Sequence, residues 1–165
     1  MHARQGHDHR HAHGVLEGER RGGRKALRTL NPDRLPTLLL DTHVFVWCVN
    51  EPEKIPPAVR DLIDDAGRVF VSLISLWEIV VKESTARPIV GTRDAQGWFN
   101  EAMADAGHRL LAIRTRHVGA IQALPLHHGD PFDRLLVAQA TVEDVPIVTA
   151  DSLLDRYDVE VIWAW

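Results

Sequence analysis

The feature of this sequence that most limits its fold is a series of short apolar runs separated by segments of helical periodicity. A strand buried on both faces is typically a continuous apolar run, and Leu38-Leu39-Leu40 is one. On this pattern we expect strands at 37–40, 69–72, 109–113, 146–150 and 159–162. Because strands alternate with helical segments, the pattern predicts an α/β fold with a mainly parallel sheet covered by helices on both faces.

Helices are expected between these strands. Pro56-Pro57 supplies prolines to a first helical turn, where a missing N–H does no harm, and Ser75 with Glu78 has the spacing of a capping box. Trp47 and Trp77 fall on core-facing positions of their helical patterns. The expected helices span 42–49, 56–66, 75–85, 93–106, 115–124 and 132–143.

The first 35 residues differ from the rest of the chain. They hold five of the ten histidines and eight Lys and Arg against four Asp and Glu, without apolar periodicity. We expect 1–35 to be a disordered His- and Arg-rich tail that can bind transition metals adventitiously. The length of 36–165 suits one globular domain.

Charge and composition exclude several classes of protein. Residues 36–165 carry eleven Lys and Arg against nineteen Asp and Glu, a balance of −8 that does not suit a duplex-DNA binder. No run of 18 apolar residues indicates a membrane span, and the N-terminus lacks the apolar segment of a signal peptide. A single cysteine, Cys48, excludes a disulfide framework and favours a cytoplasmic location.

Four acids occupy comparable places relative to the expected strands. Asp41 and Asp151 directly follow strands, Glu78 lies near the start of the helix after another, and Asp133 begins the helix leading to the strand before Asp151. The carboxyl ends of parallel strands share one edge of a sheet, where ligands bind. Carboxylates gathered there repel one another, which raises their pKa values. Divalent cations such as Mg²⁺ or Mn²⁺ bind to oxygen ligands and relieve this repulsion.

Each acid also has a local structural explanation. Asp41 and Asp151 suit helix N-caps, Glu78 can close its capping box with Ser75, and Asp133 can be a first-turn acid favoured by the helix dipole. Phosphoaspartate chemistry of the haloacid dehalogenase type is disfavoured, because it needs a second Asp where His43 stands. His43, His127 and His128 near the expected site are assigned to substrate contact or loop surface.

The four acids lie in motifs that resemble those of the PIN domain, and more closely the VapC-type toxins of bacterial toxin–antitoxin pairs. The resemblance spans about 37–165, and the block at 130–140 is its most specific part. The motifs are Leu-Leu-Leu-Asp41-Thr42-His43, Ser75-Leu76-Trp77-Glu78-Ile79, DPFDRLLVAQA (130–140) and Val148-Thr149-Ala150-Asp151.

This resemblance implies a three-layer α/β/α fold and a Mg²⁺- or Mn²⁺-dependent endoribonuclease that hydrolyses RNA. It also implies a VapB-like antitoxin partner, and a homodimer is expected. Asp41 would be the central metal ligand, Glu78 and Asp133 would complete the first site, and Asp151 would hold a second ion or orient the attacking water. A PIN-type nuclease of RNA processing outside a toxin pair, and a non-catalytic PIN-like binding module, stay open as alternatives.

Neighbouring polar residues receive supporting roles. Thr42, Ser75 and Thr149 are hydroxyls beside the acids and can hydrogen-bond to them or cap helices. Asp130 is a second acid in the same block, and spacing alone does not rank it against Asp133; helical position and the family pattern favour Asp133. Arg134 is expected to contact phosphate or, preferably, to pair with a neighbouring acid.

Overall fold

The computed structural model describes residues 35–85 and 88–165. The expected tail at 1–35 therefore lies outside the described residues, apart from Leu35. None of the helices in the described part of the chain combines the length and apolar character that a membrane span requires.

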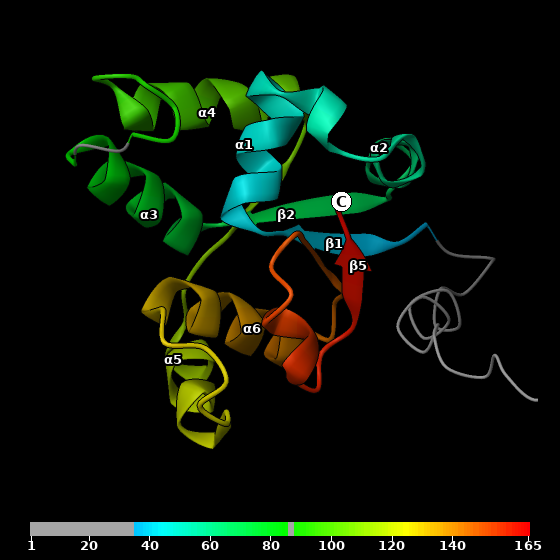
Figure 1. Cartoon of the computed structure of the whole chain (residues 1–165), viewed down its shortest axis with the longest axis vertical. Coiled ribbons are helices and arrows are strands. Elements are labelled where there is room, and N and C mark those ends of the chain that lie inside the picture. Colours follow the sequence, from blue (N-terminus) through cyan, green and yellow to red (C-terminus); the bar gives the residue numbers. More distant parts are fainter. Residues whose placement is uncertain (1–34, 86–87) are drawn as a thin grey trace, which may run out of the picture.

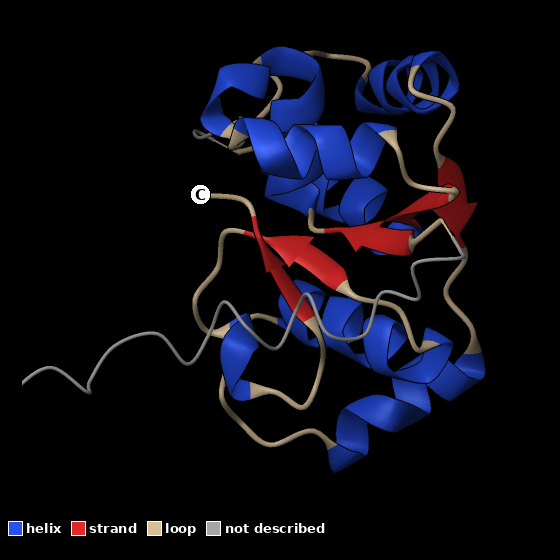
Figure 2. Ribbon diagram, turned by 90° about the vertical axis from the view of Figure 1, so that its right-hand side faces the viewer, coloured by secondary structure: helices blue, strands red, loops and turns tan. Residues whose placement is uncertain are grey.

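A five-stranded sheet forms the middle layer of the molecule (Figure 1, Figure 2). Its order is β3-β2-β1-β4-β5, and every neighbouring pair is parallel, which confirms the predicted sheet. The strands are β1 (Thr37–Leu40), β2 (Arg68–Ser72), β3 (Arg109–Leu111), β4 (Ile147–Thr149) and β5 (Val161–Trp163).

Helices cover both faces of the sheet, so the expected three-layer arrangement is confirmed (Figure 2). One layer contains α1 (Thr42–Asn50), α2 (Pro57–Asp64), α3 (Leu73–Glu83) and α4 (Ala95–Asp105), and the other contains α5 (Thr115–Ala120) and α6 (Pro131–Glu143) (Figure 1). Three short 3₁₀ helices complete the described elements: η2 (Pro52–Lys54), η3 (Ile121–Ala123) and η4 (Leu154–Arg156).

The start of α3 differs from the prediction. Ser72, the last residue of β2, caps the helix by accepting a hydrogen bond from the backbone N–H of Ile74 at 3.0 Å. The helix therefore begins at Leu73, and Ser75 lies inside it rather than at its N-cap. The capping box predicted for Ser75 and Glu78 is wrong, which leaves the Glu78 carboxylate free for another role.

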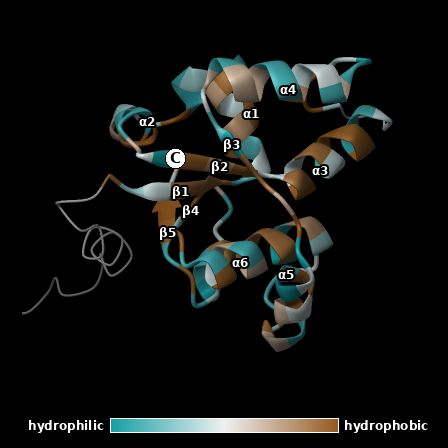
Figure 3. Ribbon diagram, turned by 180° about the vertical axis from the view of Figure 1, so that it is seen from behind, coloured by the Kyte–Doolittle hydropathy of each residue, from teal (hydrophilic) through white to brown (hydrophobic). Residues whose placement is uncertain are grey.

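The sheet separates two apolar clusters, and β1 contributes to both. Leu38 and Leu40 pack with Phe45 and Phe99 on one face, while Leu39 packs into the other cluster. All three leucines are fully buried, as the alternation of side chains in a strand covered on both faces requires. Figure 3 shows the apolar colouring of the central strands between the more polar outer surfaces of the helices.

The prediction that Trp77 faces the core is wrong. Its side chain lies on the outside of α3, 56% exposed, and contacts Phe132 edge-to-face at 5.3 Å between ring centroids. The opposite side of α3 is already filled by Ile74 and Ile79. Trp77 therefore lies at the surface although its helical spacing suits the core.

A buried polar connection ties the sheet to α6. Ser72 Oγ donates to Gln139 Oε1 at 2.5 Å, and both side chains are fully buried. Ser72 also caps α3, so one hydroxyl joins β2, α3 and α6. Since buried polar groups are costly unless paired, this connection fixes the position of α6 against the end of β2.

We expect Leu39→Ala to lower the free energy of unfolding by about 2–5 kcal/mol, because it leaves a cavity in the buried central strand. Urea unfolding followed by circular dichroism measures this difference. Leu110→Ala in the edge strand β3 is the matched control, since Leu110 is 50% exposed and a surface change costs within about 0.5 kcal/mol. Equal effects of the two substitutions would contradict the assigned position of β1.

Candidate metal centre

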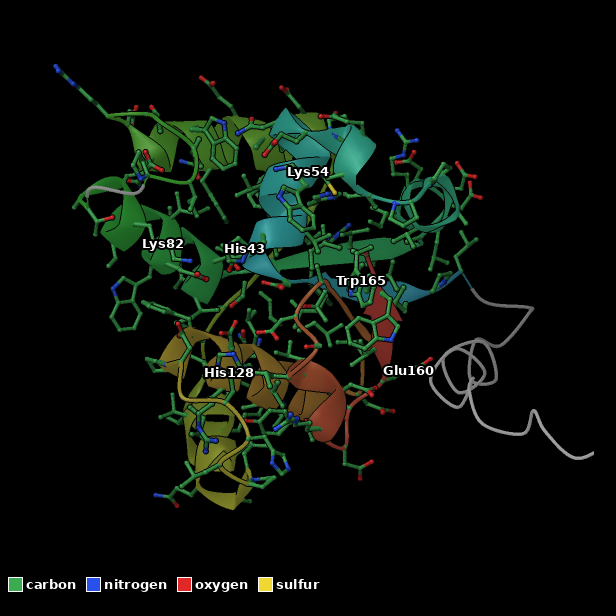
Figure 4. The ribbon with its side chains drawn as sticks, in the orientation of Figure 1. His43, Lys54, Lys82, His128, Glu160 and Trp165 are labelled. Atoms are coloured by element: carbon green, nitrogen blue, oxygen red, sulfur yellow. The ribbon has the colours of Figure 1, made fainter. Side chains whose placement is uncertain are left out.

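The carboxyl edge of the sheet brings the four predicted acids into one region. Asp41 follows β1 directly, and Asp151 lies two residues after β4. Glu78 comes from α3, which follows β2, and Asp133 comes from the first turn of α6. Figure 4 shows His43, Lys82 and His128 around the same region, between the start of α1, α3 and α6.

Asp41 is at once a helix cap and a member of this centre. Its Oδ1 accepts a hydrogen bond from the backbone N–H of His43 at 3.3 Å, which caps α1. Its Oδ2 accepts from the Thr149 hydroxyl at 2.6 Å. Burial raises the pKa of Asp41, and the negative charge of Glu78 adds to that rise. The capping explanation is therefore correct for Asp41, and it does not exclude the site.

Asp133 shows most directly that the acids gather. Its pKa is raised to about 8, chiefly by burial and then by repulsion from Asp41, Asp130, Glu78 and Asp151 in that order of strength. These carboxylates therefore act on one another across a shared region. A divalent cation would relieve their repulsion, and carboxylate oxygens are the ligands that hard cations prefer. The donor set fits such a cation.

Glu78 has a basic partner that the sequence reasoning missed. Lys82 Nζ lies 2.6 Å from Glu78 Oε1, one helical turn further along α3. The carboxylate is almost fully buried, with 5% of its side chain exposed. The Glu-to-Lys spacing of four residues is a recognisable signal for such a pair, and it could have been found before the structure.

His128 contacts two of the four acids and was also missed. Its Nε2 lies 2.9 Å from Asp151 Oδ2 and 3.4 Å from Asp133 Oδ2. The potential ligand atoms of these three residues all lie within 4.8 Å of one another. The assignment of His128 to loop surface is wrong, because only 13% of its side chain is exposed, while a contact with substrate stays a prediction. Its position in the loop before Asp130 was the available signal.

Comparison with known proteins places these residues in a family. The model of the PIN domain matches residues 38–160. The chain belongs to the PIN-domain family. Ribonuclease VapC22 of Mycobacterium tuberculosis is 30% identical over 121 residues, covering 73% of this chain and 91% of that protein.

Solved structures share the PIN fold of this chain. VapBC of Salmonella typhimurium, bound to DNA, superposes with a TM-score of 0.60 at 17% identity and covers 79% of this chain and 100% of that one. VapBC2 of Rickettsia felis, bound to a DNA fragment from its promoter, gives 0.59 at 15% identity and covers 77% and 98%.

The three hydroxyl residues that were predicted to lie beside the four acids make two kinds of contact. Thr149 accepts from the backbone N–H of Asp151 at 3.0 Å while donating to Asp41, so it links the residues that follow β1 and β4. Thr42 donates to Ser75 at 3.0 Å, and both are fully buried. That second bond joins α1 to α3 beside Asp41 and Glu78 without touching either carboxylate directly.

Capping also accounts for part of the role of two acids. Asp130 caps α6 by accepting from the backbone N–H of Phe132 at 2.8 Å, and it adds negative charge near Asp133. Asp151 accepts from the N–H of Leu153 at 2.8 Å while contacting His128. Asp133 makes no such cap, which distinguishes it from Asp130.

Within 35–85 and 88–165, Arg134 pairs with no acid, so that part of the prediction is wrong. Its guanidinium donates to the carbonyl oxygens of Pro125 at 2.7 Å and of Ile121 and Leu124 at 3.2 Å. These carbonyls belong to η3 and the residues that follow it, and the Ile121 carbonyl also accepts from the backbone N–H of Leu124 at 3.2 Å. Arg134 therefore holds the loop after α5 to α6, and its contacts lend no support to phosphate binding.

A separate cavity of about 560 Å³ lies at the opposite edge of the sheet, where β2 and β3 begin. Cys48, Ile55 and His108 are among its lining residues, and none of the four acids is. Burial raises the pKa of the Cys48 thiol to about 11, and the charge of Asp64 adds to this. Because the thiolate is the reactive form, this rise disfavours reaction at Cys48.

The raised pKa of Asp133 predicts how the stability of the metal-free protein varies with pH. The folded state keeps a proton up to about pH 8 that the unfolded chain releases near its ordinary pKa of 3.8. The free energy of unfolding should therefore fall as pH rises through this window. Relative to wild type, Asp133→Asn should gain stability with rising pH, by no more than about 1.4 kcal/mol per unit, the limit for one proton.

Urea unfolding in EDTA at pH 5, 6, 7 and 8 tests this difference. Asp144→Asn, which replaces an exposed acid at the end of the same helix, should show the pH dependence of wild type. Parallel curves for wild type and Asp133→Asn would contradict the raised pKa.

Proposed function

We propose that this protein is a VapC-type endoribonuclease that hydrolyses RNA phosphodiester bonds with Mg²⁺ or Mn²⁺, and that it acts as the toxin of a VapBC-type pair. The observation that carries the proposal is the placement of Asp41, Glu78, Asp133 and Asp151 at one edge of the sheet. There the charges of the other acids add to the effect of burial in raising the pKa of Asp133. Such an arrangement is costly for stability and becomes favourable when a divalent cation binds.

The residues divide into ligands and groups that hold them. Asp41, Glu78 and Asp133 would supply oxygens to a cation, and Asp151 would hold a second ion or orient the attacking water. When bound, a divalent cation lowers the pKa of water and neutralises charge that develops on the phosphate. Thr149 holds Asp41, and the Thr42–Ser75 bond fixes α1 against α3, so the ligands need little rearrangement.

The charge of the domain supports a cation-dependent reaction on a polyanion. Residues 36–165 carry a balance of −8, and the acids at the centre would repel an RNA phosphate. Cations at the centre would make the local electrostatic potential positive, and a positive potential favours binding of phosphate. Activity without a divalent cation is therefore not expected of this chain.

A small VapB-like antitoxin is the proposed protein partner, and a cytoplasmic location follows from that role. The acidic centre complements a basic side chain of such a partner. Leu73, Trp77, Val80 and Val81 are all at least 36% exposed along α3, and contiguous apolar surface of this kind indicates a protein interface. The same surface supports the expected homodimer.

Two other functions remain as alternatives to the toxin. A non-catalytic PIN-like module is disfavoured, because all four acids are present and gathered at one edge. A PIN-type nuclease of RNA processing would share the centre and the chemistry. A growth assay separates it from a toxin.

Asp41→Asn should reduce RNA cleavage by at least about 100-fold, the scale seen when a metal site is damaged, while the fold is retained. The measurement is cleavage of total cellular RNA in Mn²⁺ or Mg²⁺, with circular dichroism as the check on folding. Asp105→Asn, an equivalent change at an exposed acid of α4, is the matched control. Cleavage by wild type in excess EDTA, or by Asp41→Asn at the wild-type rate, would refute the proposal.

Expression of the wild-type chain in a bacterium should arrest growth, because cleavage of cellular RNA stops translation. Expression of Asp133→Asn at the same level should not arrest growth. Co-expression of a VapB-like antitoxin that binds this chain should restore growth. Active cleavage in vitro without any growth effect would favour the RNA-processing alternative.

A further inference from the structure

The ion pair between Lys82 and Glu78 runs from the buried edge of the sheet toward solvent. Lys82 Nζ lies 2.6 Å from Glu78 Oε1, and the two residues are one helical turn apart on α3 (Figure 4). The Glu78 side chain is only 5% exposed, whereas that of Lys82 is 31% exposed. An anion that approaches this edge from solvent can therefore reach the ammonium, although the carboxylate behind it is closed off.

The ammonium keeps donors that Glu78 does not use. A lysine ammonium carries three N–H groups and no acceptor, and the pair with Glu78 engages one of them. Within 35–85 and 88–165, no other oxygen forms a hydrogen bond or an ion pair with Lys82 Nζ. Two N–H groups are therefore available to the oxygens of a ligand.

Lys82 is also distinctive among the charges near the four acids. In the part of the chain that the structure describes, no other Lys or Arg forms an ion pair with any of these acids. The neighbouring charges that shift the pKa of Asp133 are all carboxylates. An RNA phosphate at this edge therefore meets one ammonium in surroundings that otherwise repel it.

The helix holds Lys82 in a defined place relative to the acids. The Thr42–Ser75 hydrogen bond, 3.0 Å long and buried, joins α3 to α1, which begins directly after Asp41. Lys82 lies in the last turn of α3, where the helix dipole favours a positive charge. Because Glu78 already restrains the long side chain, little rotamer entropy remains to be lost when the ammonium binds a phosphate.

We propose that Lys82 binds a phosphate group of the RNA substrate and so positions the strand beside the four acids. The proposal rests on the proposed function and deepens it, because it names a residue that holds the substrate. The N–H groups that Glu78 leaves unused donate to phosphate oxygens. The ammonium stays charged throughout, and no proton moves.

The other role open to Lys82 is only to neutralise Glu78, and salt separates the two roles. A lysine that binds a phosphate of single-stranded RNA releases a condensed cation. Each such contact steepens the fall of log affinity with log salt by about 0.7. An ion pair within the protein releases no cation from RNA, so its loss leaves that slope unchanged.

The test measures cleavage in Mn²⁺ of a single-stranded RNA pool of randomised sequence, labelled with a fluorophore and a quencher, over a series of KCl concentrations. Lys82→Met should raise KM by about tenfold or more with kcat retained, because a hydrogen bond to a charged group is lost. The slope of log(kcat/KM) against log salt should become shallower by about 0.7. Lys82→Arg keeps the charge and should restore the wild-type slope. Each slope is taken within one variant, so a partly unfolded sample does not alter it.

Lys54→Met is the matched control. Lys54 also pairs with a glutamate of its own segment, Glu51 at 2.5 Å, but it lies beyond the end of α1 (Figure 4). This substitution should leave both KM and the salt slope at their wild-type values.

A wild-type slope in Lys82→Met would overturn the proposal and leave Lys82 as a partner of Glu78 alone. If Lys82→Met cleaves too slowly for a slope, fluorescence anisotropy of the same RNA decides. Asp41→Asn with and without Lys82→Met should then differ in slope by about 0.7, and equal slopes would again overturn the proposal. Absence of cleavage by wild type would instead refute the proposed function.

Discussion

The pairing of β1 with strands on both sides is the constraint on which the rest of this structure depends. Leu40 pairs with Val71 of β2 and with Val148 of β4, all in parallel. Residues that follow these three positions therefore emerge at one edge, although the chain separates them widely. Asp41 stands in the middle of that edge, and the segments after β2 and β4 bring Glu78 and Asp151 to either side of it.

This arrangement gathers charge that the apolar core cannot tolerate without compensation. Thr149 donates to Asp41, Lys82 pairs with Glu78, and the Nε2 atom of His128 lies 2.9 Å from Asp151 Oδ2. From the described part of the chain Asp133 receives the longer contact with His128, at 3.4 Å, and its pKa is raised to about 8. Most of the repulsion that remains among the carboxylates therefore falls on Asp133. Binding of a cation would relieve this repulsion.

Much of this could be predicted from the sequence, because the strands are short apolar runs and the acids follow them. The parallel sheet, the layers and the four acids all came from that pattern, together with the family resemblance. The start of α3 could not be predicted, because Ser72 and Ser75 are both suitable N-caps. Tertiary contacts determine which of the two caps the helix. Trp77 was wrongly predicted to face the core. Helical spacing shows which residues share one face of a helix, but it does not show how much of that face is buried. His128 needed the fold, because the bond that orients it depends on a loop whose shape no local pattern describes.

The single hydroxyl of Ser72 has a consequence for how the molecule loses its structure. It joins the end of β2, the start of α3 and, through Gln139, the middle of α6. Glu78 and Asp133 lie on the two helices so joined, each within two turns of the connection. The edge of the sheet that carries the four acids is consequently part of the same cooperative unit as the core, so its geometry should persist on warming until the domain as a whole melts.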